Sequence, residues 1–260
     1  MVSPRRRLLL LGVAGAAVVA LLIVLGLRLS GGSGDSGVRP DQARPGTVVL
    51  VPGYGGSRTA LSRLADRLTA EGRTTDVLTL PGDGTGDLLE QSDTLDAAVR
   101  AALSKGAPSV DVIGYSAGGV VTRLWVARHD GAEVARRIVT LGSPLHGAKI
   151  AGVGAALAPD ACPQACRELA PGSDLLDGID GPIPAGLPWL SIWTENDETV
   201  QPPDSARLAG AVNVPLQSIC PQAQVGHGDL PTDPQVTALV LRALGTAPIT
   251  APTACPQTGT

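Results

Sequence analysis

The 260-residue sequence contains no phenylalanine, and aromatic residues make up only 2% of it. The core must therefore be built from Ala, Val, Leu and Ile, and aromatic platforms for stacking single-stranded nucleic acids or sugars are scarce. The sequence also lacks a strong charge bias, because 20 Lys and Arg residues stand against 24 Asp and Glu residues. Surfaces that bind nucleic acid are usually strongly basic. We therefore do not expect nucleic acid as a partner.

The N-terminal segment has the pattern of a membrane anchor. Three arginines at positions 5–7 precede an uncharged run over residues 8–27, which as a helix would be about 30 Å long and would match the apolar core of a bilayer. This run is longer than the apolar region of a typical cleaved signal peptide, which has about 7 to 15 residues. Residues 1–29 are therefore predicted to be an uncleaved anchor, with a cleaved signal as the alternative. The positive-inside rule keeps the arginines in the cytoplasm, which predicts a protein at the outer face of the membrane, or a secreted one.

Residues 30–46 are rich in Gly, Ser, Asp and Pro, which predicts a flexible tether between the anchor and a domain over residues 47–260. The length of this remainder favours one folded domain, because two full enzyme domains would need a longer chain.

The four cysteines agree with export from the cytoplasm, because an even set in an oxidising compartment is typical of disulfides. Three pairings are possible. We favour Cys162 with Cys166 and Cys220 with Cys255, since the second bond would tie a Pro- and Thr-rich tail to the domain. Only one cysteine pair is close in sequence and no histidine lies near it, so a zinc site is not expected.

Short apolar runs alternate with amphipathic ones after residue 46. The runs that read as strands are residues 47–51, 76–80, 110–113, 138–141, 190–193 and 211–214. Apolar residues recur at helical spacing in residues 59–70, 94–103 and 117–127. Strands that are apolar throughout and alternate with helices predict an α/β fold: a doubly wound, mostly parallel sheet of about six strands with helices on both faces.

The sharpest motif is Gly-Tyr-Ser-Ala-Gly at residues 114–118, which ends a predicted strand and opens a predicted helix. A Gly-x-Ser-x-Gly pattern alone is a weak signal, but its position between a strand and a helix is typical of a nucleophile elbow. The elbow predicts Ser116 as a nucleophile at the carboxyl end of the sheet. The backbone N–H of Ala117 would then donate to an oxyanion, near the positive end of the helix.

A serine hydroxyl needs a base to take its proton, and the chain has three histidines. His129 lies at the end of the helix predicted after Ser116 and is interpreted as a solvated helix-end residue. In a nucleophile-elbow fold the acid precedes the histidine along the chain, and His146 leaves no place for such an acid. His146 is therefore interpreted as a loop residue near the pocket. His227, flanked by glycines beyond the last predicted strand, is the predicted base.

The acid is expected in the turn after residues 190–193, which contains Glu195, Asp197 and Glu198. Asp197 is favoured because a short side chain on a tight turn is well placed to orient the imidazole, and the two glutamates remain alternatives. The second oxyanion donor is assigned to the backbone N–H of Tyr54, in a glycine-rich loop after the first strand. That loop lacks the Lys-Ser/Thr ending of a P-loop, so phosphate binding is not expected.

These segments together resemble the α/β-hydrolase superfamily, and within it the small bacterial lipases of the triacylglycerol lipase type. The resemblance rests on residues 51–57, 114–119 and 141–147, and Asp197 and His227 fall where that family keeps its acid and base. It implies hydrolysis of a carboxylic ester or lipid through an acyl-enzyme, without a cofactor or a metal. The departures are Pro52, where many members have histidine, and the anchor, where many have a cleaved signal.

Residues 147–188 lie between the fourth and fifth predicted strands, where hydrolases carry lids. The apolar run at 150–157, the nearby cysteine pair and three prolines predict a short covering segment that lines an acyl pocket. Two other functions fit the same residues: an acyltransferase with the same triad of Ser116, Asp197 and His227, or a catalytically silent binding module on a hydrolase scaffold. A silent module would usually have lost one member of this triad.

Overall fold

The computed structural model describes residues 39–257, and the anchor predicted at residues 1–29 lies outside this range. Six parallel strands form one sheet in the order β2-β1-β3-β4-β5-β6. The strands are β1 (Thr47–Val51), β2 (Thr75–Val77), β3 (Val110–Tyr115), β4 (Ala135–Leu141), β5 (Trp189–Trp193) and β6 (Val212–Pro215). From β1 the chain adds β2 on one side and then β3 to β6 on the other, which confirms the predicted doubly wound parallel sheet.

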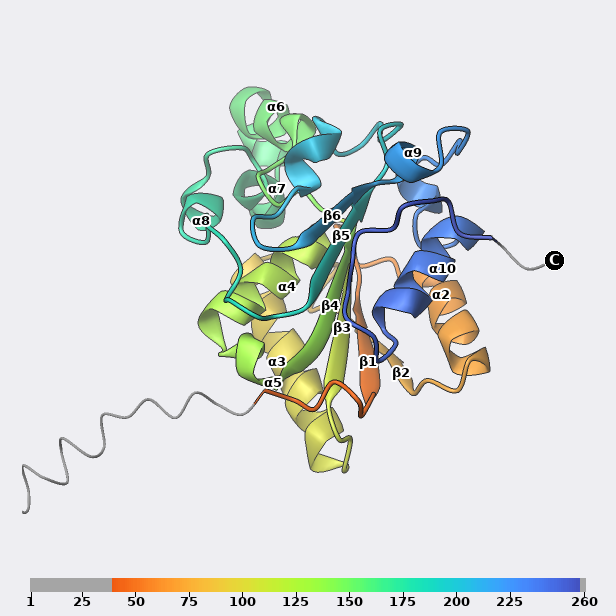
Figure 1. Ribbon diagram of the computed structural model, residues 1–260. Helices are drawn as coiled ribbons and strands as arrows, with labels where there is room; N and C mark the ends of the chain where they lie inside the picture. The colour runs from red at the N-terminus through yellow and green to blue at the C-terminus, as the bar shows by residue number, and fades with distance from the viewer. Residues whose placement is uncertain (1–38, 258–260) are drawn as a thin grey trace, which may run out of the picture. The chain divides into compact units, whose positions relative to one another are not determined.

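Helices cover both faces of the sheet, and each face has its own apolar cluster. Figure 1 shows α2 (Thr59–Ala70) and α10 (Pro234–Ala243) on one side, and α3 (Leu88–Ser104) and α4 (Ala117–Arg128) on the other. Short helices α5 (Gly131–Val134) and α9 (Leu216–Ile219) lie in the connections. Both clusters consist mainly of Val, Leu, Ile and Ala, as the scarcity of aromatic residues requires.

Several predicted elements have other bounds in the structure, among them β2 and α3. β2 ends at Val77 instead of residue 80, and Leu78 and Leu80 are buried in the apolar cluster that also contains residues of α3 and α4. Helix α3 begins six residues before its predicted start. The carboxylate of Asp87 accepts a hydrogen bond from the Leu89 N–H at 2.7 Å and caps this first turn, as acidic residues commonly do.

Residues 39–46, the described end of the segment predicted to be a tether, lie against the domain and make specific hydrogen bonds. The backbone carbonyl of Gln42 accepts from Arg136 at 3.0 Å, and the Gln42 amide donates to the Arg136 carbonyl at 3.1 Å. The carbonyl of Arg44 accepts from the Ser109 hydroxyl at 2.8 Å. Composition could not reveal this, since the partners come from β4 and from the residue before β3. The folded domain therefore includes residues from Arg39 onward.

The segment at 147–188 contains three short helices, and Figure 1 shows two of them, α6 and α7, beyond the carboxyl ends of the strands. The elements are α6 (Lys149–Leu157), the 3-10 helix η1 (Pro159–Ala161), α7 (Gln164–Glu168) and α8 (Asp174–Asp177). The largest apolar side chains of α6 face solvent: Ile150, Val153 and Leu157 are 67%, 56% and 80% exposed. These three side chains therefore form an open apolar surface on α6.

Both favoured disulfides are present, and they confirm the predicted pairing of Cys162 with Cys166 and of Cys220 with Cys255. The first bond lies beside α6: a side-chain carbon built on Gly154 would come within 3.2 Å of the Cys166 sulfur. Among the helices of residues 39–257, none combines the length and apolar character needed to cross a membrane.

Candidate active site

Ser116 lies in the turn between β3 and α4, with φ 52° and ψ −128°. It is one of two non-glycine residues with positive φ among residues 39–257, and such a conformation costs on the order of 1–3 kcal/mol. The Ser116 N–H donates to the carbonyl of Leu141 at 2.8 Å, which ties the turn to the end of β4. The strained turn is thus fixed by the neighbouring strand, and it places the hydroxyl at the carboxyl end of the sheet.

Two glycines allow the backbone to approach this turn closely. A side-chain carbon at Gly118 would lie 2.2 Å from the carbonyl oxygen of Val51. One at Gly53 would lie 2.9 Å from the β-carbon of Ser116. Gly53 therefore brings the glycine-rich loop after β1 directly against Ser116.

The structure brings Ser116, His227 and Asp197 together. The His227 Nε2 lies 3.0 Å from the Ser116 Oγ, and its Nδ1 lies 2.7 Å from the Asp197 Oδ2. Asp197 comes from the turn after β5, and His227 opens the 3-10 helix η3 (His227–Asp229). Asp197 and His227 are only 1% and 6% exposed. This arrangement can pass a proton from the serine to an imidazole whose other nitrogen is held by a carboxylate.

The geometry distinguishes Asp197 from the two glutamates in the same turn. The second oxygen of Asp197, Oδ1, accepts hydrogen bonds from the N–H groups of Thr199 at 2.9 Å and Val200 at 2.7 Å, so the carboxylate is held in one orientation. Glu195 and Glu198 are exposed. Glu198 meets the backbone N–H of His227 at 3.4 Å and makes no hydrogen bond to the imidazole ring.

The two predicted oxyanion donors lie on segments that meet at Ser116. Ala117 is the first residue of α4, and Tyr54 follows Gly53 in the loop that contacts Ser116. Within residues 39–257, neither the Tyr54 nor the Ala117 N–H donates to a backbone or side-chain acceptor. Both groups therefore remain able to donate to a substrate oxygen.

Known proteins with a similar sequence or structure share this architecture. A family model described as "PGAP1-like alpha/beta domain" matches residues 82–154, which include the turn at Ser116 and β4. No curated protein matches the chain by sequence. Among solved structures, Aspergillus fumigatus lipase B has a TM-score of 0.68 at 22% identity and covers 81% of this chain. The chain has the α/β-hydrolase fold.

Two bacterial structures share this hydrolase fold. Bacillus licheniformis lipase BlEst2 in its mature form has a TM-score of 0.64 at 19% identity, covering 82% of this chain and 96% of its own. A lipase-esterase related protein from Clostridium acetobutylicum ATCC 824 has a TM-score of 0.52 at 15% identity, covering 78% of this chain and 96% of its own. The chain spans about half of the Aspergillus lipase, of which 54% is covered.

The other two histidines have different surroundings. His129 follows the last turn of α4, and its Nε2 lies 2.9 Å from the Asp93 carboxylate. His146 is exposed in the loop after β4, and its Nε2–H donates to the carbonyl of Arg207 at 2.9 Å. Neither forms a hydrogen bond with Ser116 within the described part of the chain.

Tyr115 is a site residue that the sequence did not reveal. Its hydroxyl donates to the backbone carbonyl of His227 at 3.2 Å, and its ring centroid lies 5.3 Å from that of the imidazole. Burial, together with the charges of Asp197, Glu198 and Asp229, raises the pKa of Tyr115 to about 12. The hydroxyl is therefore a proton donor at neutral and moderately alkaline pH. The motif leaves this position open, so no sequence signal identified it.

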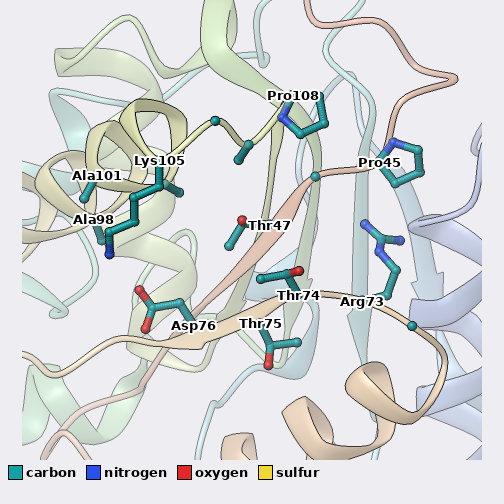
Figure 2. A pocket seen from close by; sticks show the side chains of 15 residues that line it. Pro45, Thr47, Arg73, Thr74, Thr75, Asp76, Ala98, Ala101, Lys105 and Pro108 are labelled. Atoms are coloured by element: carbon teal, nitrogen blue, oxygen red, sulfur yellow. The ribbon is translucent and has the colours of Figure 1, made fainter.

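A hollow lined by residues of β1, β2 and α3 and of the loops beside them lies at the opposite end of the sheet. It has a volume of about 890 Å³, and Figure 2 shows Thr47, Thr75 and Asp76 around it, with Lys105 beside them. Thr47 and Thr75 begin β1 and β2, whereas Ser116 follows the end of β3. The residues that line the hollow include no serine, histidine or cysteine. It is therefore separate from the candidate active site.

Among the described residues, no group of three or more His, Cys, Asp or Glu side chains is placed to bind a metal ion.

Proposed function

We propose that this protein hydrolyses carboxylic esters, as a lipase or carboxylesterase, through an acyl-enzyme on Ser116. The observation that carries the proposal is the continuous line of hydrogen bonds from the Ser116 Oγ through His227 to Asp197, at 3.0 Å and 2.7 Å. A serine in a strained elbow that also contacts a buried, carboxylate-held imidazole fits nucleophilic catalysis better than any structural role.

The proposed reaction has two halves. In the first, His227 takes the hydroxyl proton of Ser116 while the oxygen attacks the ester carbonyl carbon. The N–H groups of Tyr54 and Ala117 donate to the resulting oxyanion. The tetrahedral intermediate then collapses, and the imidazolium gives its proton to the departing alcohol. In the second half, water attacks the acyl-enzyme with His227 again as the base, and the carboxylic acid leaves. Asp197 holds the imidazole and stabilises its positive charge in both halves.

We propose that the acyl part of the ester substrate is apolar. The names of the similar structures, lipases and a lipase-esterase related protein, support this, as does the apolar surface of α6. No charged residue occurs between Ile150 and Pro159, so α6 offers an open apolar surface beyond the carboxyl ends of the strands. We propose that the reaction takes place outside the cytoplasm, because the N-terminal residues resemble an anchor and both cysteine pairs are oxidised.

The test uses a fluorophosphonate probe, which labels an activated serine without requiring knowledge of the natural ester. We expect the full chain to be labelled and Ser116→Ala not to be. We also expect kcat on p-nitrophenyl esters to fall by about 10⁶-fold in the variant. Equal labelling of the two proteins, or near-normal turnover by Ser116→Ala, would overturn the proposal.

The acyl preference is tested separately with p-nitrophenyl esters of two to sixteen carbons. Ile150→Ser and Leu157→Ser are expected to reduce kcat/KM for the long esters more than for the short ones, because they remove apolar surface from α6. An unchanged profile would contradict a role for α6 in binding the acyl chain.

A further inference from the structure

We propose that Tyr115 is a positioning residue for His227, which fastens the loop carrying the base to the strand carrying the nucleophile. The inference rests on the proposed function, because it assigns Tyr115 a role in the reaction of Ser116. Tyr115 is the last residue of β3 and is joined to Ser116 by a peptide bond. Its hydroxyl reaches the His227 carbonyl at 3.2 Å across 112 positions of sequence.

The base needs such a contact because little regular structure surrounds it. His227 stands at the start of a three-residue 3-10 helix, and the residues just before it are in no helix or strand. A shift of the base by about 1 Å can cost a large factor in rate. Tyr115 and Ser116 are adjacent residues of one short segment. When this segment moves, the hydrogen bond from Tyr115 moves the loop of His227 with it. The contact therefore keeps the distance between nucleophile and base constant.

Hydrogen bonds hold both the carbonyl and the N–H of the His227 backbone. Its carbonyl accepts from the Tyr115 hydroxyl and also from the Leu230 N–H at 3.3 Å. Its own N–H points to a carboxylate oxygen of Glu198 at 3.4 Å. Of these partners, Tyr115 alone belongs to the strand that presents the nucleophile. Its hydroxyl is thus a second link between the base and the segment that carries the nucleophile, in addition to the hydrogen bond between the His227 ring and Ser116.

The tyrosine ring adds an effect on charge. The two ring centroids lie 5.3 Å apart, and the ring planes are inclined by 31°, so the tyrosine ring lies beside the imidazole, within the roughly 6 Å over which an aromatic ring can attract a cation. The face of an aromatic ring attracts a cation, and the imidazole becomes a cation when it takes the serine proton. The charged groups near His227 are Asp197, Glu198 and Asp229. They remain when Tyr115 is replaced, so the contribution of the ring can be measured by itself.

Two variants separate the hydroxyl from the ring. Tyr115→Phe keeps the ring and loses the hydrogen bond, and Tyr115→Leu loses both. Thr237→Val is the matched control, because it removes a hydroxyl that donates to the Asp233 carbonyl at 2.8 Å in α10. Turnover of p-nitrophenyl butyrate is measured per active site, with active sites counted by fluorophosphonate titration. Any unfolded fraction therefore does not enter kcat.

Tyr115→Phe should lower kcat about 3- to 10-fold, the equivalent of one lost hydrogen bond, with KM changed less than twofold and an unchanged pH profile. Tyr115→Leu should lower kcat further and move the acid limb of the kcat/KM profile about half a pH unit lower, because the cation loses its aromatic neighbour. Thr237→Val should match the wild type. A kcat per active site in both tyrosine variants equal to that of Thr237→Val would overturn the inference.

A second measurement does not depend on turnover. The chain has three histidines, so the ¹³Cε1 signal of His227 can be assigned by its disappearance in His227→Ala and followed by NMR as a function of pH. We expect a lower imidazole pKa in Tyr115→Leu than in the wild type and Tyr115→Phe, and no shift would overturn the role of the ring. Failure of the wild type to react with the probe would instead overturn the proposed function, whatever the NMR titration shows.

Discussion

Gly142 lies against the ring of His227 with no side chain between them. A side-chain carbon built on Gly142 would come within 3.2 Å of the His227 Nδ1 and 3.3 Å of the Asp197 Oδ2. It would also lie 2.5 Å from a methyl group of Leu230, and Gly142 has φ +54°. The hydrogen bond between acid and base therefore depends on an empty position at the end of β4.

Gly142→Ala should accordingly reduce kcat by about 10-fold, because the added methyl group displaces the acid and base by a few tenths of an ångström. The control is Gly72→Ala, whose φ of +79° is also positive but which has no atom within 4 Å of the added carbon. Both variants should lose about 1 kcal/mol or more of unfolding free energy to backbone strain. The loss of kcat should occur in Gly142→Ala alone, and an equal loss in both variants would contradict the steric explanation.

The identity of the acid can be tested by two amide replacements in the same turn. Asp197→Asn should lower kcat by about 10⁴-fold, because the amide no longer holds the correct imidazole tautomer. Glu198→Gln should lower it less than 10-fold, since Glu198 meets only the backbone N–H of His227. Steady-state kinetics on one short ester provides the measurement. A larger loss in Glu198→Gln than in Asp197→Asn would assign the role to the glutamate.

The raised pKa of Tyr115 predicts how stability depends on alkaline pH. An ordinary tyrosine has a pKa of 10.0, whereas burial and three nearby carboxylates raise that of Tyr115 to about 12. Above pH 10 the unfolded chain loses this proton before the folded protein does, so the contribution of Tyr115 to stability is complete below pH 10 and declines toward pH 12. Urea unfolding of wild type and Tyr115→Phe between pH 8 and 11.5 should show wild type losing stability relative to the variant. A constant difference would contradict the raised pKa.

A buried ion cluster at the amino end of β3 supports the fold far from the site. The Oδ2 of Asp111 lies 2.5 Å from guanidinium nitrogens of both Arg73 and Arg136, and Asp111 and Arg136 are fully buried. The same two arginines donate to the carbonyl of Leu244 just after α10. The cluster therefore joins two strands, the residue after α10 and the turn after α2.

Asp111→Asn should cost about 3–5 kcal/mol of unfolding free energy, because the buried guanidinium of Arg136 and the partly buried one of Arg73 lose their counter-charge. Arg100→Gln is the control: the Arg100 side chain is 70% exposed, and its i,i+4 ion pair with Asp96 should contribute no more than about 0.5 kcal/mol. Denaturant unfolding measures both. The kcat per active site should be unchanged in Asp111→Asn, and a loss comparable to that of the triad variants would indicate coupling to the site.

Local sequence predicted the features of this protein that depend on local pattern. Apolar runs alternating with helical periodicity predicted the six parallel strands, and a motif of five residues at 114–118 predicted the turn at Ser116. Chain order then selected His227 from three histidines. The cysteine spacing favoured the observed disulfides. These features were predictable because periodicity, tight turns and short loops are properties of neighbouring residues.

Tertiary structure alone decided the remaining features. Tyr115 meets His227 across 112 positions, Gly142 makes room for an acid and a base from two other loops, and residues 39–46 are ordered by β4 and the approach to β3. Each depends on the direction of a side chain or a strand end in space, which composition and periodicity do not encode. The sequence by itself therefore determined the sheet and the candidate nucleophile, acid and base. Only the packing of distant segments decided what holds the base in place, because that support comes from residues far apart in the chain.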